Sequence, residues 1–210
     1  MRKAVLRNSK HLLKVYRDTN MIIDISQEVL SCKVYPGDPS PEVSKLCDMN
    51  QGEVYNLTSI SMCNHNGTHV DAPAHFLKDG KTIDQISLDS FVGECYVACI
   101  QGDISKEMAS EILEKAQGID KILLAGELTV TAEAAAVFAK AGIKLLGNES
   151  QSVGPEDAPM EVHKILLEAG VVLLEGIVLT DVEEGKYFLS AAPLNIAGCE
   201  GAPCRAYLIK

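Results

Sequence analysis

Short apolar segments alternate with helix-like segments along the second half of this 210-residue chain. Ser105 and Thr131 each precede such a helical segment, and a serine or threonine side chain there accepts hydrogen bonds from the first free N–H groups of a helix. Gly142 and Gly170 follow helical segments and are typical stop signals. We predict helices over residues 105–117, 131–141 and 159–169, and strands over 121–125, 144–146 and 171–175. This alternation favours a parallel or mixed sheet with helices packed on it.

The first half of the chain is predicted to be rich in strands. A turn-rich segment, residues 35–39, separates the first two of them. We expect strands over residues 22–25, 53–62, 91–100, 187–191 and 204–209. The chain is long enough to bury the core of one domain. We therefore divide it into a basic N-terminal extension, residues 1–20, which carries a surface histidine, His11, and a single domain over residues 21–210.

Charge and cysteine content limit the classes of partner and the compartment. The net charge of −10 argues against a nucleic-acid partner, which requires a basic surface. No apolar run is long enough to cross a membrane, and the first twenty residues lack the apolar core of a secretory signal. Seven cysteines without such a signal indicate reduced thiols, most of them small buried side chains. We expect a cytoplasmic protein that binds neither nucleic acid nor membrane.

Three of the five histidines fall within eleven residues, His65 to His75, which read HNGTHVDAPAH. Imidazole and carboxylate groups are the ligands of Zn²⁺, Mn²⁺ and Fe²⁺. Gly67 and Pro73 predict irregular backbone here, neither a helix nor a regular strand. A closed structural zinc site usually uses several cysteines, and no Cys-x-x-Cys pair is present, so a catalytic site is favoured. Cys63 lies two residues before His65, close enough to approach the metal but not required as a ligand.

Two residues outside this cluster are candidates to complete the site. His163 lies in the third predicted helix, and Glu175 ends the strand that follows it. Gly170 interrupts the chain between them, so the helix and the strand can fold back on each other. The spacing alone leaves both roles open, and it favours a surface histidine and a solvated glutamate.

These residues together resemble the cyclase family of metal-dependent hydrolases, which includes bacterial kynurenine formamidases and isatin hydrolases. The family motif is His-x-Gly-Thr-His-x-Asp-x-Pro-x-His, and residues 65–75 match every fixed position. The resemblance runs from about Ile22 to the C-terminus and excludes residues 1–20. It implies a compact α/β fold with a mixed, barrel-like central sheet and flanking helices, assembled as a homodimer or homotetramer.

The resemblance also implies a set of functional residues. One metal ion would be held by His65, His69 and Asp71, and a second by Asp71 together with His163 and Glu175. The ion is Zn²⁺ or alternatively Mn²⁺, with one or two ions per chain. His75 is the expected general acid and base. Thr68 and Asp38 are candidates for hydrogen bonds that orient the ligands.

The implied activity is hydrolysis of a C–N amide bond in a small molecule, as in an arylformamidase. A divalent ion brings the pKa of its bound water close to neutrality, and the resulting hydroxide attacks the carbonyl carbon while His75 transfers protons. The chain departs from the formamidase pattern at residues 126–130, which lead directly into a helix, and it has no Trp. These departures leave a lactam or isatin-type cyclic amide as an alternative substrate, and a non-catalytic metal- or ligand-binding protein as an alternative function. Arg205 is a positive group that would favour an anionic substrate.

Overall fold

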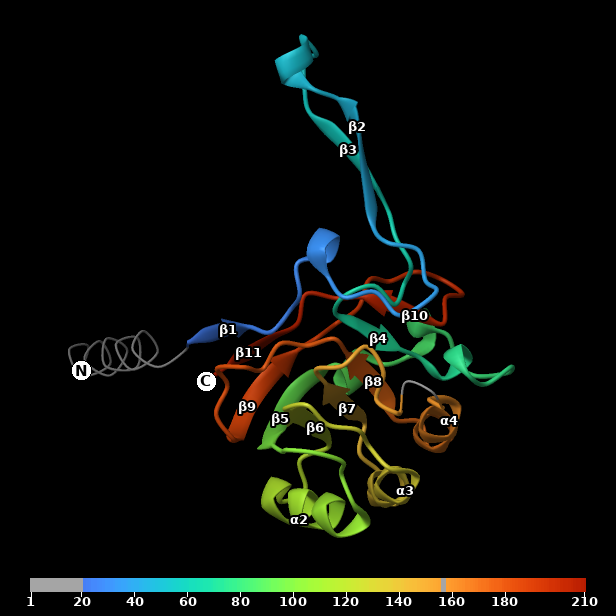
Figure 1. Cartoon of the computed structure of the whole chain (residues 1–210), viewed down its shortest axis with the longest axis vertical. Helices are drawn as coiled ribbons and strands as arrows, with labels where there is room; N and C mark the ends of the chain where they lie inside the picture. Colours follow the sequence, from blue (N-terminus) through green and yellow to red (C-terminus); the bar gives the residue numbers. More distant parts are fainter. Residues whose placement is uncertain (1–20, 156–157) are drawn as a thin grey trace, which may run out of the picture.

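A nine-stranded mixed sheet forms the centre of the molecule in the computed structural model, which describes residues 21–155 and 158–210 (Figure 1). The strand order is β1-β11-β9-β5-β6-β7-β8-β4-β10. The strands of this sheet are β1 (Ile22–Asp24), β4 (His69–Asp71), β5 (Val92–Cys99), β6 (Lys121–Ala125), β7 (Leu145–Asn148), β8 (Val172–Glu175), β9 (Gly185–Ser190), β10 (Gly201–Pro203) and β11 (Tyr207–Ile209).

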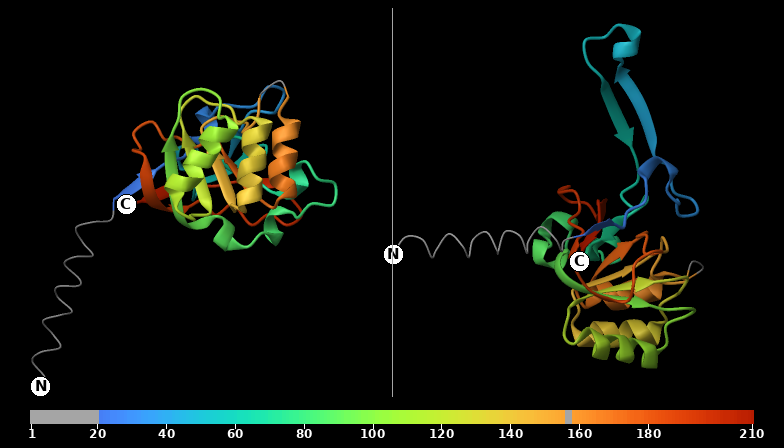
Figure 2. Two further views of the ribbon diagram at one scale, coloured as in Figure 1. Left: turned by 90° about the horizontal axis from the view of Figure 1, so that it is seen from below. Right: turned by 90° about the vertical axis from the view of Figure 1, so that its left-hand side faces the viewer.

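Four adjacent strands, β5 to β8, are parallel, and a helix connects each of them to the next. The helices are α2 (Lys106–Ala116), α3 (Ala132–Ala141) and α4 (Met160–Glu168). They lie side by side on one face of the sheet (Figure 2). The side chains of Ser105 and Thr131 cap α2 and α3 as predicted, and Gly142 ends α3 with φ 71°. Apolar residues of the helices and strands, among them Leu124, form one core between the two layers.

A second core lies on the opposite face of the sheet, and the sheet curves around this core like part of a barrel. Val70, Leu123 and Leu174 are buried there together with residues of β9 and β11. The Val178 N–H donates to the Ile25 carbonyl over 2.9 Å, which links the segment after β8 to the segment after β1. The predicted α/β fold with a mixed, barrel-like sheet and flanking helices is therefore confirmed.

A two-stranded hairpin extends from this body (Figures 1 and 2). It consists of β2 (Glu42–Cys47) and β3 (Leu57–Ser61), with a short 3-10 helix near its tip. The sequence predicts one strand over residues 53–62, but the strand begins at Leu57 because the preceding residues belong to the tip, and β2 was not predicted. The 3-10 helices are η1 (Val29–Ser31), η2 (Met49–Gln51), η3 (Pro73–His75), η4 (Ile83–Gln85) and η5 (Leu88–Ser90).

The prediction of irregular backbone throughout residues 65–75 is wrong in the middle of that segment. His69–Asp71 form β4, which pairs with β8 on one side and β10 on the other. The strand is only three residues long and has no alternation of its own, so its identity depends on these two neighbours. β10 was not predicted for the same reason. The remaining predicted helices and strands are present, with ends displaced by a few residues.

Two other predictions concern cysteines and the N-terminus. All seven cysteines lie in described residues and are free thiols, but Cys95 alone among them is buried, so the prediction that most are buried is wrong. The basic extension and His11 lie outside the described residues. Among the helices that the structure describes, none is long and apolar enough to cross a membrane.

Phe138 tests the core between the helices and the sheet, because its side chain is fully buried there. Phe138→Ala should lower the free energy of unfolding by about 3–5 kcal/mol through lost burial and a residual cavity. Phe188→Ala is the matched control, since the Phe188 side chain on β9 is 43% exposed and should lose far less. Urea unfolding of both variants measures the difference, and equal losses would contradict the assigned core.

Candidate metal centre

The pairing of β4 with β8 brings the first two candidate ligands beside a third. His69 lies directly opposite Glu175 in the antiparallel register, and Asp71 lies two residues further along β4. Successive side chains of a strand point to opposite faces, so His69 and Asp71 share one face while Val70 joins the opposite core. On the shared face lies α4, which contributes His163.

Asp71 is the centre of the cluster, and its side chain is fully buried. Its Oδ1 atom lies 2.8 Å from His65 Nδ1 and 3.4 Å from His69 Nε2. Its Oδ2 atom lies 3.7 Å from His163 Nε2 and 3.8 Å from His75 Nε2. Burial opposes ionisation of this carboxyl, but the hydrogen bond to His65 and the nearby imidazole of His69 hold the Asp71 pKa well below its usual range. The group is therefore a buried anion surrounded by imidazoles.

Two of the imidazoles are held in the orientation that a metal ligand needs. His69 Nδ1 lies 3.0 Å from the Gly67 carbonyl oxygen, and His163 Nδ1 lies 2.8 Å from that of Pro159. A carbonyl oxygen only accepts, so both Nδ1 atoms carry protons and donate. Each Nε2 atom then faces the carboxylates of Asp71 and Glu175. Such a backbone bond to the far nitrogen is the usual support of a ligating histidine.

Glu175 forms the second carboxylate of the cluster. Its Oε1 atom accepts the Val153 N–H over 2.7 Å and lies 3.3 Å from His163 Nε2. Its Oε2 atom lies 3.4 Å from His69 Nε2. Burial and the nearby charge of Asp71 oppose ionisation of Glu175, but the adjacent imidazoles of His163 and His69 hold its pKa below the usual value. Glu175 is thus ionised, buried and neither surface-exposed nor solvated.

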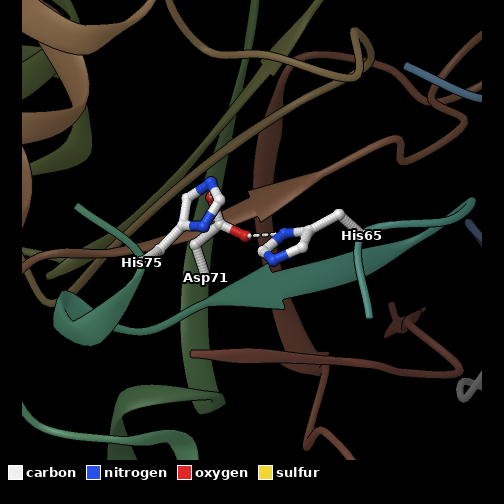
Figure 3. Close-up of side chains that lie close together, drawn as sticks. All are labelled: His65, Asp71 and His75. Atoms are coloured by element: carbon white, nitrogen blue, oxygen red, sulfur yellow. Dashed lines mark hydrogen bonds and ion pairs between the residues drawn. The ribbon is translucent and has the colours of Figure 1, made fainter. Parts of the chain in front are cut away.

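His65 and His75, which flank Asp71 in Figure 3, are the more exposed of the four imidazoles around it, with side chains 14% and 28% exposed. Their rings stack with centroids 4.1 Å apart, and the dashed line in Figure 3 marks the bond from His65 to Asp71. Burial lowers the pKa of the His75 imidazole. His65 Nε2 also lies 3.2 Å from Glu200 Oε1. Glu200 was not predicted as a neighbour of His65, because it precedes β10, whose pairing with β4 was not predicted.

The cluster fits a divalent cation. His69 Nε2 and Asp71 Oδ2 are buried and have no hydrogen-bond partner among the residues described. Burial disfavours a charged His69, but the carboxylates of Asp71 and Glu175, each with an oxygen 3.4 Å from Nε2, raise its pKa to about 10. Two sets of ligand atoms each lie within 4.8 Å of one another: His65, Asp71 and His75, and His69, Asp71 and Glu175. Nitrogen and oxygen donors of this kind bind zinc and manganese.

A pocket of about 250 Å³ opens onto this cluster. Tyr35 and Phe76 contribute aromatic walls. The pocket is lined by Tyr35, Asp38, Cys63, His65, His69, His75, Phe76, Gln151, Ser152, Pro159, His163 and Glu175. The structure therefore brings all six predicted site residues together, and all but Asp71 line this pocket.

The other predicted residues have different surroundings. Asp38 lies on the pocket wall, where Cys63 Sγ is 3.9 Å from its Oδ2 atom. Thr68 donates to the Gly176 carbonyl over 2.6 Å and accepts the Gln27 N–H over 2.9 Å, so it fixes the segment after β8 and contacts no ligand side chain directly. Arg205 does not line the pocket. It is 77% exposed and pairs with Asp24, so it does not attract an anionic substrate.

Comparison with known proteins agrees with the metal centre described above and indicates the family of the chain. The family model Cyclase, described as "Putative cyclase", matches residues 23–155. The chain is 33% identical to a kynurenine formamidase of Erythrobacter litoralis over 207 residues, covering 92% of this chain and 95% of that protein. It is 35% identical to a kynurenine formamidase of Salinibacter ruber over 204 residues, covering 89% and 96%.

Solved structures agree with this result. One, described as a potential metal-dependent hydrolase with cyclase activity, has a TM-score of 0.80 at 27% identity and covers 91% of this chain and 98% of its own. Isatin hydrolase A from Labrenzia aggregata has a TM-score of 0.80 at 21% identity, with 97% and 98% covered, and shares the fold. The protein belongs to the cyclase family.

A substitution of Asp71 tests the metal centre, because the oxygens of Asp71 lie within 3.8 Å of the nitrogens of all four imidazoles. Asp71→Asn removes the buried negative charge and should abolish stoichiometric zinc or manganese binding, whereas the wild-type chain should bind one or two ions. Asp79→Asn, an exposed aspartate nearby in the chain, is the control and should leave metal content unchanged. Elemental analysis measures the content, and circular dichroism checks that the variants are folded. Full metal content in folded Asp71→Asn protein would contradict the site.

Proposed function

We propose that this protein is a divalent-metal-dependent hydrolase that cleaves the C–N bond of a small aryl amide, as an arylformamidase does. The observation that carries the proposal is a buried set of imidazoles and carboxylates, with unpartnered ligand atoms, at the base of a pocket with aromatic walls. The kynurenine formamidase relatives, which match almost the whole chain, support the same reaction class.

The proposed ligands follow from the two sides of Asp71. We assign His65, His69 and Asp71 to one ion, and Asp71, His163 and Glu175 to a second where two are bound. Zinc is the proposed metal and manganese the alternative, because the donors are nitrogen and oxygen atoms without a thiolate at the centre of the cluster. When bound, the metal supplies a Lewis acid and an activated water at neutral pH.

The residues around the proposed metal site have separate proposed roles in catalysis and substrate binding. Buried Asp71 and Glu175 hold the imidazoles in place and lower the cost of concentrating positive charge there. His75 is the proposed acid and base because its ring is partly exposed in the pocket and its Nε2 atom faces the cluster. It takes a proton from the attacking water and returns it to the leaving nitrogen. Phe76 and Tyr35 line the pocket where an aryl ring would pack.

The size of the pocket limits the substrate. Its volume of about 250 Å³ lies below the range of about 300–1,000 Å³ typical of drug-sized ligands, so a compact molecule is expected. A cyclic amide of the isatin type remains an alternative that this pocket also accommodates. A non-catalytic metal-binding protein is the second alternative. We also propose a cytoplasmic location, which seven free thiols support.

The proposal is tested by metal analysis together with turnover. Protein purified without chelator is analysed for metal and then assayed with N-formylkynurenine, formanilide and isatin. Hydrolysis of a formamide that is lost on chelation and restored by zinc or manganese supports the arylformamidase assignment. Turnover of isatin alone favours the cyclic-amide alternative. Metal without turnover of any of the three favours the non-catalytic one.

His75 separates chemistry from metal binding. His75→Gln keeps a polar side chain of similar size but removes the proton-transfer group, so kcat should fall by about a hundredfold or more. Its metal content should equal that of the wild type, whereas His69→Ala should lose metal as well as activity. Elemental analysis and steady-state kinetics distinguish the two. An unchanged kcat in metal-loaded His75→Gln would exclude this role.

The hairpin supports a proposal that the protein assembles as a homodimer or homotetramer. Val43 and Ile60 lie opposite each other on the two strands, and both are at least half exposed. Leu46 and Tyr55 on the same hairpin are also exposed. A two-stranded hairpin alone is at best marginally stable, so these side chains need a surface to cover them. We propose that a second copy of the chain provides it.

Assembly is measured by sedimentation. The wild-type protein should sediment as a dimer or larger at micromolar concentration. A Val43→Ser, Ile60→Ser double variant should shift toward the monomer because the apolar contact is weakened. Leu88→Ser is the control, since Leu88 is exposed on the body away from the hairpin. A monomeric wild type would refute the proposed assembly without affecting the metal site.

A further inference from the structure

The segment after β7 forms part of the pocket wall and is fixed at both ends. The Glu149 carboxylate accepts the N–H groups of Gly126 and Leu179, each over 2.7 Å. The Val153 N–H donates to Glu175 over 2.7 Å. Gln151 lies between these two anchors and lines the pocket.

The side-chain amide of Gln151 has a defined orientation. Its Nε2 atom lies 3.4 Å from the Gly67 carbonyl oxygen, which also accepts the Nδ1–H of His69 over 3.0 Å. Since this carbonyl only accepts, the amide must present its NH₂ group to it. Gly176 leaves room for the amide, because a Cβ atom there would lie 2.3 Å from Gln151 Nε2.

This orientation leaves the oxygen of the amide without a partner. Gln151 Oε1 is buried and accepts no hydrogen bond from any residue that the structure describes. A buried acceptor left unpaired costs free energy, so a missing donor is expected. Ser152 Oγ, also in the pocket wall, is unpaired too, but a hydroxyl can donate or accept and so defines no polarity. Gln151 Oε1 can only accept.

We propose that Gln151 is a specificity-determining residue that accepts a hydrogen bond from an N–H group of the substrate. The inference rests on the proposed function, because it concerns the molecule that enters the metal pocket. A secondary amide carries such an N–H on the scissile bond, whereas an ester and an N-alkylated amide do not. A site with a buried acceptor discriminates against the analogue that leaves it unpaired. The pocket therefore selects N–H-bearing amides.

Two substrates and one variant test this selection. Formanilide carries the N–H group, and phenyl formate replaces it with oxygen. Gln151→Met keeps the length of the side chain and removes the acceptor. We expect kcat/KM for formanilide to fall by about tenfold in metal-loaded Gln151→Met, with a change below about twofold for phenyl formate. Gln101→Met, an exposed glutamine outside the metal pocket, should change neither.

The outcome separates a role in substrate recognition from a role in structure. Gln151 also touches the carbonyl that orients His69, so a purely structural role would lower both rates equally or reduce metal content. Either of those results overturns the proposal. Metal content is therefore measured for each variant, and N-methylformanilide, which lacks the N–H, should follow phenyl formate.

Failure of the proposed function gives a different result. If the wild type hydrolyses none of these compounds, the hydrolase assignment fails, and calorimetry on the metal-loaded protein tests Gln151 alone. Wild-type protein should then bind acetanilide more tightly than phenyl acetate, and Gln151→Met should lose that preference. An unchanged preference, or no binding of either compound, overturns the inference.

Discussion

The site depends on one buried carboxylate. Asp71 is fully buried, and the nitrogens of four histidines lie within 3.8 Å of its oxygens. An isolated anion at this depth would be strongly disfavoured, so the structure must surround it with positive charge or donors. The imidazoles supply this only in part, since one oxygen of Asp71 keeps no hydrogen bond among the described residues. The buried negative charge that the imidazoles leave uncompensated makes the cluster unfavourable without a cation. For the same reason, the cluster should bind a divalent ion strongly.

The sheet brings segments that are distant in the sequence together to form this cluster. β4 supplies His69 and Asp71, β8 supplies Glu175 directly opposite, and the helix that precedes β8 supplies His163. Backbone carbonyls at Gly67 and Pro159 orient the two histidines. Four of the five proposed ligands stand on paired strands and a helix packed against them, so the core sets their positions, whereas His65 lies in the turn before β4. The face of β4 that points away contributes Val70 to that core.

Much of the fold was predictable from the sequence because its helices and several of its strands are defined by local sequence patterns. The caps at Ser105 and Thr131 and the apolar runs fix α2, α3 and the parallel strands through short-range hydrogen bonding and periodicity. β4 and β10 were missed because three-residue strands are defined by their neighbours, not by a pattern of their own. Spacing alone also favoured a surface position for His163, and the motif resemblance was needed to place it at the metal. Glu200 carried no signal, since its contact with His65 arises only from the pairing of β10 with β4.

The Gly67 carbonyl connects the candidate metal centre with the part of the pocket wall that carries Gln151. It accepts one hydrogen bond from the proposed ligand His69 and one from Gln151, so the position of Gln151 is linked to the proposed metal site without Gln151 being a ligand. Within the described part of the chain, the Gln151 side chain makes no hydrogen bond with Asp71 or Glu175, so its replacement should alter the polarity of the wall without removing any proposed ligand. The segment that carries Gln151 is held by Glu149 and Val153 and not by the ligands' side chains alone. The proposed selection of substrates therefore depends on a residue that is separate from the proposed metal ligands.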